Sequence, residues 1–198
     1  MDGKTTLTRE AWILAAFRAL TQSGPQSLKA EPLARALKVS KGSFYWHFKN
    51  VDDLKQAMIA HWHQVATAEI IAEIRRSEQA PRAALSRLLV LSVTPRDAPF
   101  GGPATEAAIR DWARYEGFVQ QAVETVDAQR VHFVAGLMRQ YGLAAPEATQ
   151  KARLLYAALI GLEALSLSGM DHVHGDLQAL LAALLPPRTQ AQESATPA

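Results

Sequence analysis

Apolar residues recur at helical spacing along most of the chain, and no segment shows the sustained alternation of a strand. Prolines and glycines divide this pattern into separate segments, because proline is tolerated in the first turn of a helix and glycine commonly ends one. The sequence therefore predicts an all-α fold of about nine helices without an internal repeat. Its 198 residues are enough to bury a substantial core.

The first fifty residues contain two short helical segments, at residues 30–37 and 41–48. A connection of only three residues joins them, which predicts a helix-turn-helix unit. In such a unit the first helix packs behind the second, so the apolar residues of this region are expected to form one small core. Its predicted members are Phe17, Leu20, Leu33, Leu37, Val39, Phe44 and Phe48.

Two side chains of this region are placed to cap helices. Thr8 precedes the first helix, and Leu7 and Trp12 have the spacing of a hydrophobic staple around its start. Asn50 precedes a fourth helix, whose pattern runs without a break to about Arg76. These caps predict where the two helices begin.

Residues Ser40 to Phe48 read SKGSFYWHF, which interleaves aromatic, cationic and small residues within one or two turns of helix. The small pair Gly42 and Ser43 allows a partner to approach the backbone, as in a helix that enters a DNA groove. Ammonium, hydroxyl and imidazole groups bind phosphate or base edges, and an aromatic face contacts a thymine methyl. The alternative is a helix whose aromatic residues only fill the core, which we prefer for Phe44 and Phe48. The expected exposed set is Lys41, Ser43, Tyr45, Trp46 and His47.

Charge is unevenly distributed along the chain. Residues 1–50 contain eight lysines and arginines against three acidic residues, whereas residues 51–198 contain 13 basic and 16 acidic residues. A basic segment attached to a mildly acidic body favours a polyanionic partner for that segment. Ordinary surface charge is the alternative explanation.

Composition and missing motifs exclude several classes of protein. The chain has no cysteine, which excludes disulfides and thiolate chemistry. No signal sequence and no membrane-length apolar stretch is visible, so we expect a cytoplasmic location and no membrane segment. A nucleophile elbow, a phosphate-binding loop and a dinucleotide fingerprint are also missing, so we expect neither an enzyme nor a cofactor.

Short motifs between Thr8 and Met58 follow one another in a familiar order. They are the Ala15-Ala16 helix that ends in a glycine, Leu33-Ala34, Val39 to Tyr45, His47-Phe48 and Asp53-Leu54. In these residues the chain resembles the TetR (tetracycline-repressor-like) family of bacterial regulators. The resemblance implies that Tyr45 and His47 bind backbone phosphates and that Lys41, Gly42 and Ser43 lie against bases. The candidate DNA-contacting residues are therefore Lys29, Lys41, Gly42, Ser43, Tyr45, Trp46, His47 and Lys49.

Three positions depart from the family pattern. Lys38 stands where members usually have glycine, so the turn of the helix-turn-helix must accept a side chain. Glu31 stands where many have a basic residue, so it will repel phosphate or select a cytosine amino group. Val51 replaces a lysine that is common at the start of the fourth helix. General DNA binding is therefore expected, but no base preference is.

Residues Leu154 to Leu162 are apolar on every side of a helix, which indicates two buried faces. Ala157, Ala158, Gly161 and Ala164 are small enough for close approach of another helix, so we infer a two-fold homodimer. The TetR resemblance implies the same, because the last two helices of the family form a four-helix interface. A central helix of a monomer is the alternative. The predicted interface residues are Leu155, Ala158, Leu159, Gly161, Leu162, Leu165, Leu177 and Leu181.

The resemblance also implies a ligand pocket within the helical body. An apolar or aromatic small molecule is the expected effector. Arg110, Asp127 and Arg130 are interpreted as charges that hold helices together rather than as ligand contacts. The candidate pocket residues, for which ordinary core packing is the alternative, are Trp62, Trp112, Phe118, Met138 and Tyr156.

A group of acidic and histidine residues, Asp171, His172, His174 and Asp176, precedes or opens the last helix. These are ligand types that suit zinc or nickel. A solvated capping loop is the preferred interpretation, so no metal is predicted.

Together these patterns predict a ligand-responsive transcriptional regulator, most often a repressor in this family. It would bind a palindromic double-stranded DNA operator as a homodimer and be released by a small-molecule effector. The predicted domains are a helix-turn-helix over residues 1–50, a ligand-binding and dimerisation body over 51–187, and a disordered tail over 188–198. A small-molecule carrier with a decayed DNA-binding head is the rival interpretation.

Overall fold

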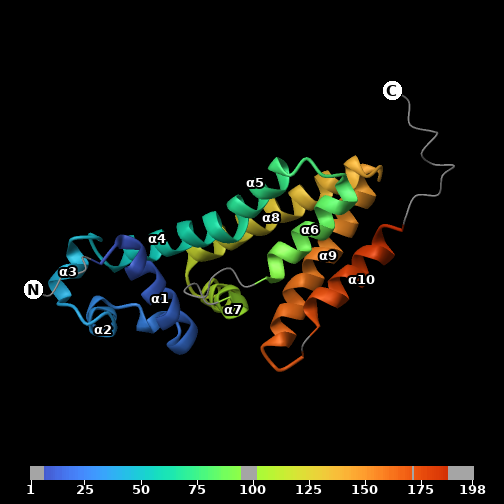
Figure 1. The fold of residues 1–198 in the computed structure, drawn as a ribbon. Helices are drawn as coiled ribbons and strands as arrows, with labels where there is room; N and C mark the ends of the chain where they lie inside the picture. The colour runs from blue at the N-terminus through green and yellow to red at the C-terminus, as the bar shows by residue number, and fades with distance from the viewer. Residues whose placement is uncertain (1–6, 95–101, 171, 187–198) are drawn as a thin grey trace, which may run out of the picture. The chain divides into compact units, whose positions relative to one another are not determined.

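The computed structural model of the chain describes residues 7–94, 102–170 and 172–186 and contains no strand within them (Figure 1). The predicted all-α fold is confirmed. Helices α4, η2 and α5 follow one another without a break, as expected for the fourth helix, although η2 is a π-helical turn. The helices are α1 (Arg9–Ser23), η1 (Pro25–Ser27), α2 (Ala30–Ala36), α3 (Lys41–Tyr45), α4 (Val51–His63), η2 (Gln64–Ala68), α5 (Glu69–Arg76), α6 (Pro81–Val93), α7 (Gly102–Trp112), α8 (Gly117–Gln140), α9 (Ala145–Ser166) and α10 (Val173–Leu184).

The chain forms two compact units, and each takes in segments that are distant in sequence. The first unit comprises Met1–Ile71 and Thr94–Ala128, and the second comprises Ala72–Val93 and Gln129–Ala198. Helices α4, α7 and the first half of α8 thus share a unit with the helix-turn-helix. The predicted functional division at residue 50 stays a prediction, and the predicted tail at 188–198 lies outside the described residues.

Helix starts in the first unit are fixed by the predicted caps. The Oγ1 atom of Thr8 accepts a hydrogen bond of 3.1 Å from the Ala11 N–H. Asn50 accepts one of 2.9 Å from the Asp53 N–H, and the Asp53 carboxylate in turn accepts one of 3.0 Å from the Lys49 N–H. Both predicted caps are confirmed, and at the second the Asp53 side chain also binds the N–H of the residue before the N-cap.

The turn between α2 and α3 is a Schellman motif in which Lys38 takes the position that glycine normally occupies. Lys38 has φ of 57°, its N–H donates to Arg35 O at 3.1 Å, and the Val39 N–H donates to Ala34 O at 3.0 Å. The turn therefore accepts the Lys38 side chain in the left-handed region. This was expected, because Lys38 stands where members of the family usually have glycine. This conformation carries a cost of about 1–2 kcal/mol in a residue with a Cβ atom.

Helix α3 is shorter than predicted. It covers Lys41–Tyr45, whereas the sequence pattern extended it to Phe48. After Tyr45 the chain continues as a turn, in which the N–H groups of His47 and Phe48 both donate to Phe44 O at 3.0 Å. This turn brings the Phe48 side chain into the core, where it is buried.

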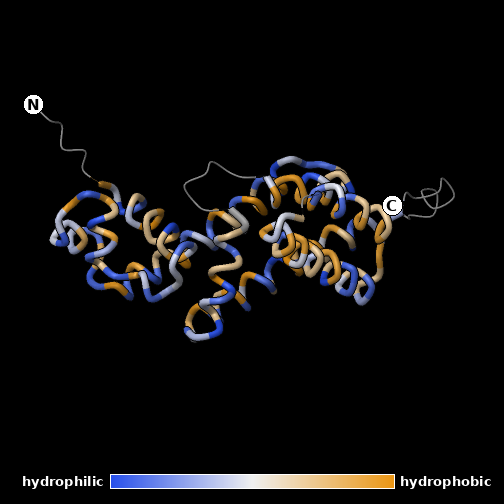
Figure 2. Tube along the Cα trace, turned by 90° about the horizontal axis from the view of Figure 1, so that it is seen from below, coloured by the Kyte–Doolittle hydropathy of each residue, from blue (hydrophilic) through white to orange (hydrophobic). Residues whose placement is uncertain are grey.

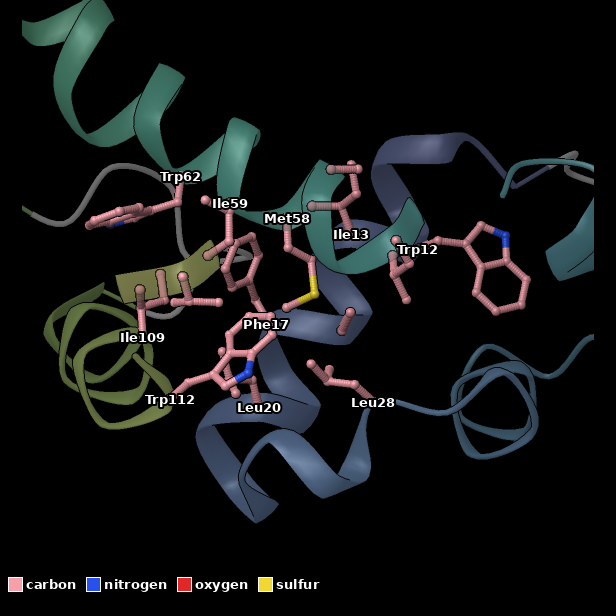
Figure 3. Packing of buried hydrophobic residues seen from close by; sticks show 14 of the residues in the cluster. Trp12, Ile13, Phe17, Leu20, Leu28, Met58, Ile59, Trp62, Ile109 and Trp112 are labelled. Atoms are coloured by element: carbon pink, nitrogen blue, oxygen red, sulfur yellow. The ribbon is translucent and has the colours of Figure 1, made fainter. Parts of the chain in front are cut away.

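One apolar core joins the helices of the first unit (Figure 3). All seven predicted core residues of the helix-turn-helix belong to it, with Leu37 and Val39 at its partly buried edge. The core continues beyond the head through α4 and α7, because Met58, Trp62 and Ile109 pack into the same cluster. Along the described helices, hydrophobic residues are interspersed with hydrophilic ones at short intervals, as expected of amphipathic helices (Figure 2).

In the second unit, α10 packs against α6 and α9. Polar side chains hold the end of α10 by donating to carbonyl groups of its last residue and of the two residues that follow. Lys151 donates to Leu184 O at 2.8 Å, Tyr141 donates to Pro186 O at 2.7 Å, and Arg82 donates to Leu185 O. Within the described ranges, no helix is long and apolar enough to cross a membrane.

Candidate DNA interface, dimer surface and effector residues

The residues at the end of α3 are exposed to an unusual degree. Trp46 is 88% exposed and Tyr45 is 55% exposed, although both carry large aromatic rings. Their neighbours Phe44 and Phe48 are buried, which is the division predicted for this segment. Of the other candidate DNA contacts, Ser43 and His47 are half-buried, and the exposed ones are Lys29, Lys41, Gly42 and Lys49.

Gly42 has no role in the packing of the chain itself. A Cβ atom at this position would meet only Ser40 Oγ, at an ordinary contact distance of 3.7 Å. Glycine also lowers the stability of a helix relative to alanine. The fold therefore gives no reason for glycine at this exposed position of α3, whereas a partner that approaches the backbone would.

The N-terminus of α4 is only partly available to an anion. The Asp53 N–H is already used by Asn50, and the Asp53 carboxylate lies 3.6 Å from Arg9 Nη2. Glu31 at the start of α2 lies 3.4 Å from Arg35, and both side chains are exposed. Cations that are free to meet phosphate are thus concentrated on Lys29 and on the segment around α3.

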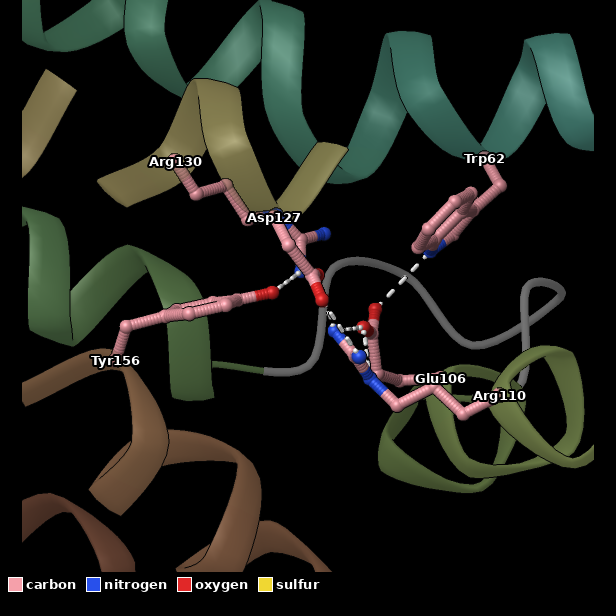
Figure 4. Close-up of polar contacts among 6 residues, drawn as sticks. All are labelled: Trp62, Glu106, Arg110, Asp127, Arg130 and Tyr156. Atoms are coloured by element: carbon pink, nitrogen blue, oxygen red, sulfur yellow. Dashed lines mark hydrogen bonds and ion pairs between the residues drawn. The ribbon is translucent and has the colours of Figure 1, made fainter. Parts of the chain in front are cut away.

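The candidate effector residues are divided between the two units. In the first, Trp62 and Trp112 are buried, and Phe118 packs edge-on against Trp112 with ring centroids 5.7 Å apart. In the second, Met138 is buried, and the Tyr156 hydroxyl accepts a hydrogen bond of 3.1 Å from Arg130 (Figure 4). Their role in binding a ligand stays a prediction.

Arg110 on α7 is the centre of a part-buried ionic network in the first unit (Figure 4). Its guanidinium donates to both Asp127 oxygens on α8, at 2.6 and 3.1 Å, and its Nε atom donates to Glu106 at 2.9 Å. The second Glu106 oxygen accepts a hydrogen bond of 3.1 Å from Trp62 Nε1 on α4. The network joins three helices, which agrees with the interpretation of these charges as structural.

The outward side of α9 and α10 is a run of small and apolar residues. Leu154 is 53% exposed and Leu165 is 45% exposed, and a Cβ atom at Gly161 would meet nothing within 4 Å. These residues recur every three or four positions, so they form one stripe along α9. Three alanines of α10 are exposed as well. This α9–α10 surface consists of Leu154, Ala157, Gly161, Ala164, Leu165, Ala179, Ala182 and Ala183.

Three of the eight predicted interface residues do not lie on the α9–α10 surface. Leu155, Leu177 and Leu181 are buried within the protomer, so their side chains are not available to a partner. Ala158, Leu159 and Leu162 are half-buried at its edge, whereas Gly161 and Leu165 are exposed on it. A helix that is apolar on all sides does not reveal which face turns inward.

The acidic and histidine group before α10 is only partly described. Asp171 lies outside the described residues, and His172, His174 and Asp176 are exposed at the start of α10. Within the described ranges, no three histidine or acidic side chains are grouped closely enough to hold a metal ion.

A family model covers most of the helix-turn-helix region. Residues 13–58 match the model of the bacterial regulatory proteins of the tetR family. This chain carries a tetR-family domain. The resemblance seen in the motifs of residues 8–58 is thereby confirmed. No curated protein matches the chain.

Solved structures share the fold of this chain over nearly its whole length. A TetR-family transcriptional regulator from Streptomyces coelicolor has a TM-score of 0.73 and 21% identity, covering 92% of this chain and 90% of its own. A transcriptional regulator from Rhodococcus sp. Rha1 has a TM-score of 0.69 and 19% identity, covering 90% and 96%. SmeT, the repressor of the Stenotrophomonas maltophilia multidrug efflux pump SmeDEF, has a TM-score of 0.66 and 18% identity, covering 90% and 89%.

Two residues of the first unit were missed by the sequence motifs. Glu106 was not singled out, although its spacing of four residues from Arg110 is that of a helical ion pair and was a usable signal. Trp12 was assigned only to the staple, yet its ring packs edge-on against that of Phe44 in α3. Only the fold places Trp12 and Phe44 side by side.

Proposed function

We propose that this TetR-family regulator binds a palindromic DNA operator as a homodimer through α3 and the turn after it. The observation that carries this proposal is the exposure of Trp46 and Tyr45 beside buried Phe44 and Phe48. Exposed aromatic residues of this size are uncommon on a surface without a partner. Cationic side chains surround them. A partner that carries negative charge and also offers apolar surface fits this arrangement, and DNA does so through its phosphates and its bases.

The contacts divide into two classes. Lys29, Lys49, Tyr45 and His47 carry donors suited to phosphate, which position the protein without reading sequence. Lys41, Ser43 and Trp46 offer groups that suit base edges and the thymine methyl in the major groove. Gly42 lets the backbone of α3 approach the duplex closely.

A second copy of the chain is the proposed occupant of the α9–α10 surface. Small side chains there allow close packing of helices, and a two-fold axis would make the same surface self-complementary. A symmetric dimer presents two recognition helices that read successive major-groove faces, about 34–36 Å apart. An inverted repeat is therefore the expected form of the operator.

An apolar or aromatic small molecule is the proposed effector. Its candidate contacts are Trp62, Trp112 and Phe118 in the first unit, or Met138 and Tyr156 in the second. Binding would favour a conformer whose recognition helices no longer match the half-site spacing. Such coupling between two sites typically amounts to about 1–3 kcal/mol. Repression is the proposed direction of control. SmeT, which has a similar fold, is itself a repressor.

Substitutions at α3 are expected to separate positioning from reading. Tyr45→Phe and His47→Ala should weaken binding to every duplex by a similar factor, about five- to tenfold, because phosphate contacts carry no sequence information. Ser43→Ala should instead change the order of preference among duplexes that differ at one base pair. Fluorescence anisotropy with a selected duplex and its base-substituted versions measures both effects.

Ser23→Ala provides the matched control, because Ser23 is an exposed serine at the far end of α1. It should change neither affinity nor preference. A uniform loss for Ser43→Ala across all duplexes would refute the base-reading role of Ser43.

A further inference from the structure

Trp12 on α1 has an unusual environment for a tryptophan. Its side chain is fully buried, and its Nε1–H group has no hydrogen-bond acceptor among the described residues. Leaving a buried donor unpaired is unfavourable, and buried tryptophans usually find a partner. A phenylalanine would fill much of the same space without this cost. The larger indole ring therefore calls for a reason beyond filling the core.

The indole ring contacts the segment that we assign to DNA. Its centroid lies 5.4 Å from that of Phe44 in an edge-on arrangement, and 6.4 Å from the imidazole of His47 at an interplanar angle of 45°. Figure 3 shows the indole pointing away from Phe17 and Trp112, which belong to the other part of the core. Trp12 thus contacts both Phe44, which is buried in α3, and the half-buried His47 in the turn after it.

Helix α3 is too short to hold its own position. It has five residues, its N-cap Ser40 makes no side-chain cap bond, and Gly42 lies within it. Isolated helices of this length are not stable, so packing must fix both the helix and the turn that follows it. Phe44 supplies much of that packing, because its ring contacts those of Trp12, Tyr45 and Phe48.

His47 lies in that turn, beyond the last residue of α3. Its backbone N–H is bonded to Phe44 O at 3.0 Å, which fixes the main chain but not the imidazole ring. The residue is half-buried. The indole of Trp12 is the aromatic surface against which the imidazole lies.

We propose that Trp12 is a positioning residue for DNA binding, which holds the His47 imidazole in the orientation that donates to phosphate. The indole reaches past Phe44 to the imidazole, and this contact is the reason for the larger ring. Without it, His47 would sample several rotamers and lose entropy on binding. This inference rests on the proposed function, because it assigns to Trp12 a role in the DNA contact of His47.

A double-mutant cycle tests the proposal with the full-length chain and a duplex that the unaltered protein has selected from a random pool. His47→Ala should weaken binding about tenfold, because the phosphate contact of the imidazole is lost. Trp12→Leu should weaken it about fivefold, because the imidazole is then no longer held in place for that contact. If Trp12 acts through His47, the double variant should bind within about twofold of His47→Ala alone. Full additivity in the cycle would overturn the proposal.

A second cycle, with Lys41→Ala in place of His47→Ala, separates positioning from a general structural role. Lys41 is exposed at the start of α3 and has no ring contact with Trp12. The effects of Trp12→Leu and Lys41→Ala should add. If Trp12 only stabilised the fold, it would be coupled to both residues equally, and that result would overturn the proposal. Where Trp12→Leu does not fold, Trp12→Phe keeps a ring beside Phe44 and removes the unpaired donor, and the same two cycles apply.

The outcomes distinguish this inference from the proposed function. Weaker binding by His47→Ala together with additive effects of Trp12→Leu leaves DNA binding intact and refutes only the role of Trp12. Failure of the unaltered chain to bind any duplex refutes both. Unchanged binding by His47→Ala refutes the phosphate contact of His47 and the role of Trp12 with it.

Discussion

Ala157→Glu on α9 or Ala182→Glu on α10 is expected to dissociate the dimer and to weaken binding to a palindromic duplex about a thousandfold. Both alanines are exposed on the α9–α10 surface. In a dimer each substitution would bury a carboxylate at the proposed interface, among small and apolar side chains. A single protomer on one half-site retains little beyond the non-specific phosphate contacts. Sedimentation velocity measures the dissociation, and anisotropy measures the affinity.

Gln140→Glu is the matched control for this experiment. It adds the same charge at an exposed position at the end of α8 and lies outside the α9–α10 surface. The control should remain dimeric and bind DNA as the unaltered chain does. If the two alanine variants also remained dimeric, the proposed interface would be wrong.

Arg110→Met is expected to lower the free energy of unfolding by about 2–4 kcal/mol. Its guanidinium is shared by Glu106 and Asp127 at distances of 2.6–3.1 Å, and all three side chains are part-buried. Methionine has a similar length but leaves the two carboxylates without their shared cation. The size of the loss follows from burial, since a part-buried charge is screened less than a surface one. Urea denaturation followed by circular dichroism measures it.

Arg114→Met tests whether burial is the cause. Arg114 lies four residues later, is 71% exposed and has Asp111 at 3.8 Å. Removing an exposed pair of this kind should cost no more than about 0.5 kcal/mol. Equal losses at positions 110 and 114 would contradict a special role for the network.

The elements that the sequence predicted well are those fixed by local chemistry. Thr8 and Asn50 begin their helices because each side-chain oxygen accepts a nearby N–H, and that bond depends on residues within the same turn. The seven-residue core of the helix-turn-helix was also predicted in full. Short helices with one apolar face leave only one way to bury it.

The elements predicted poorly are those fixed by contacts across the fold. Helix α3 ends at Tyr45 because Phe48 turns into the core, and the pattern of the segment alone does not contain that turn. The sequence pattern also does not reveal which face of α9 turns inward. Leu155 turns inward and Leu154 outward, although both are leucines within a run that is apolar on every side.

The network around Arg110 and the contact of Trp12 with α3 illustrate the same division. Asp127 lies 17 residues from Arg110, and Trp62 lies 44 residues from Glu106. No spacing rule joins residues so far apart in sequence. The Glu106–Arg110 pair, four residues apart, was the part of the network that a local rule could have identified.

The most direct test of operator binding by a two-fold dimer is selection of duplexes from a random pool by the full-length chain. If α3 reads the major groove from both protomers of a two-fold dimer, the selected duplexes should share an inverted repeat with half-sites about one helical turn apart, or a multiple of it. Binding to them should weaken steeply as salt concentration rises, because phosphate contacts release counterions. Enrichment of no sequence, or of a single half-site without its inverted copy, would contradict it.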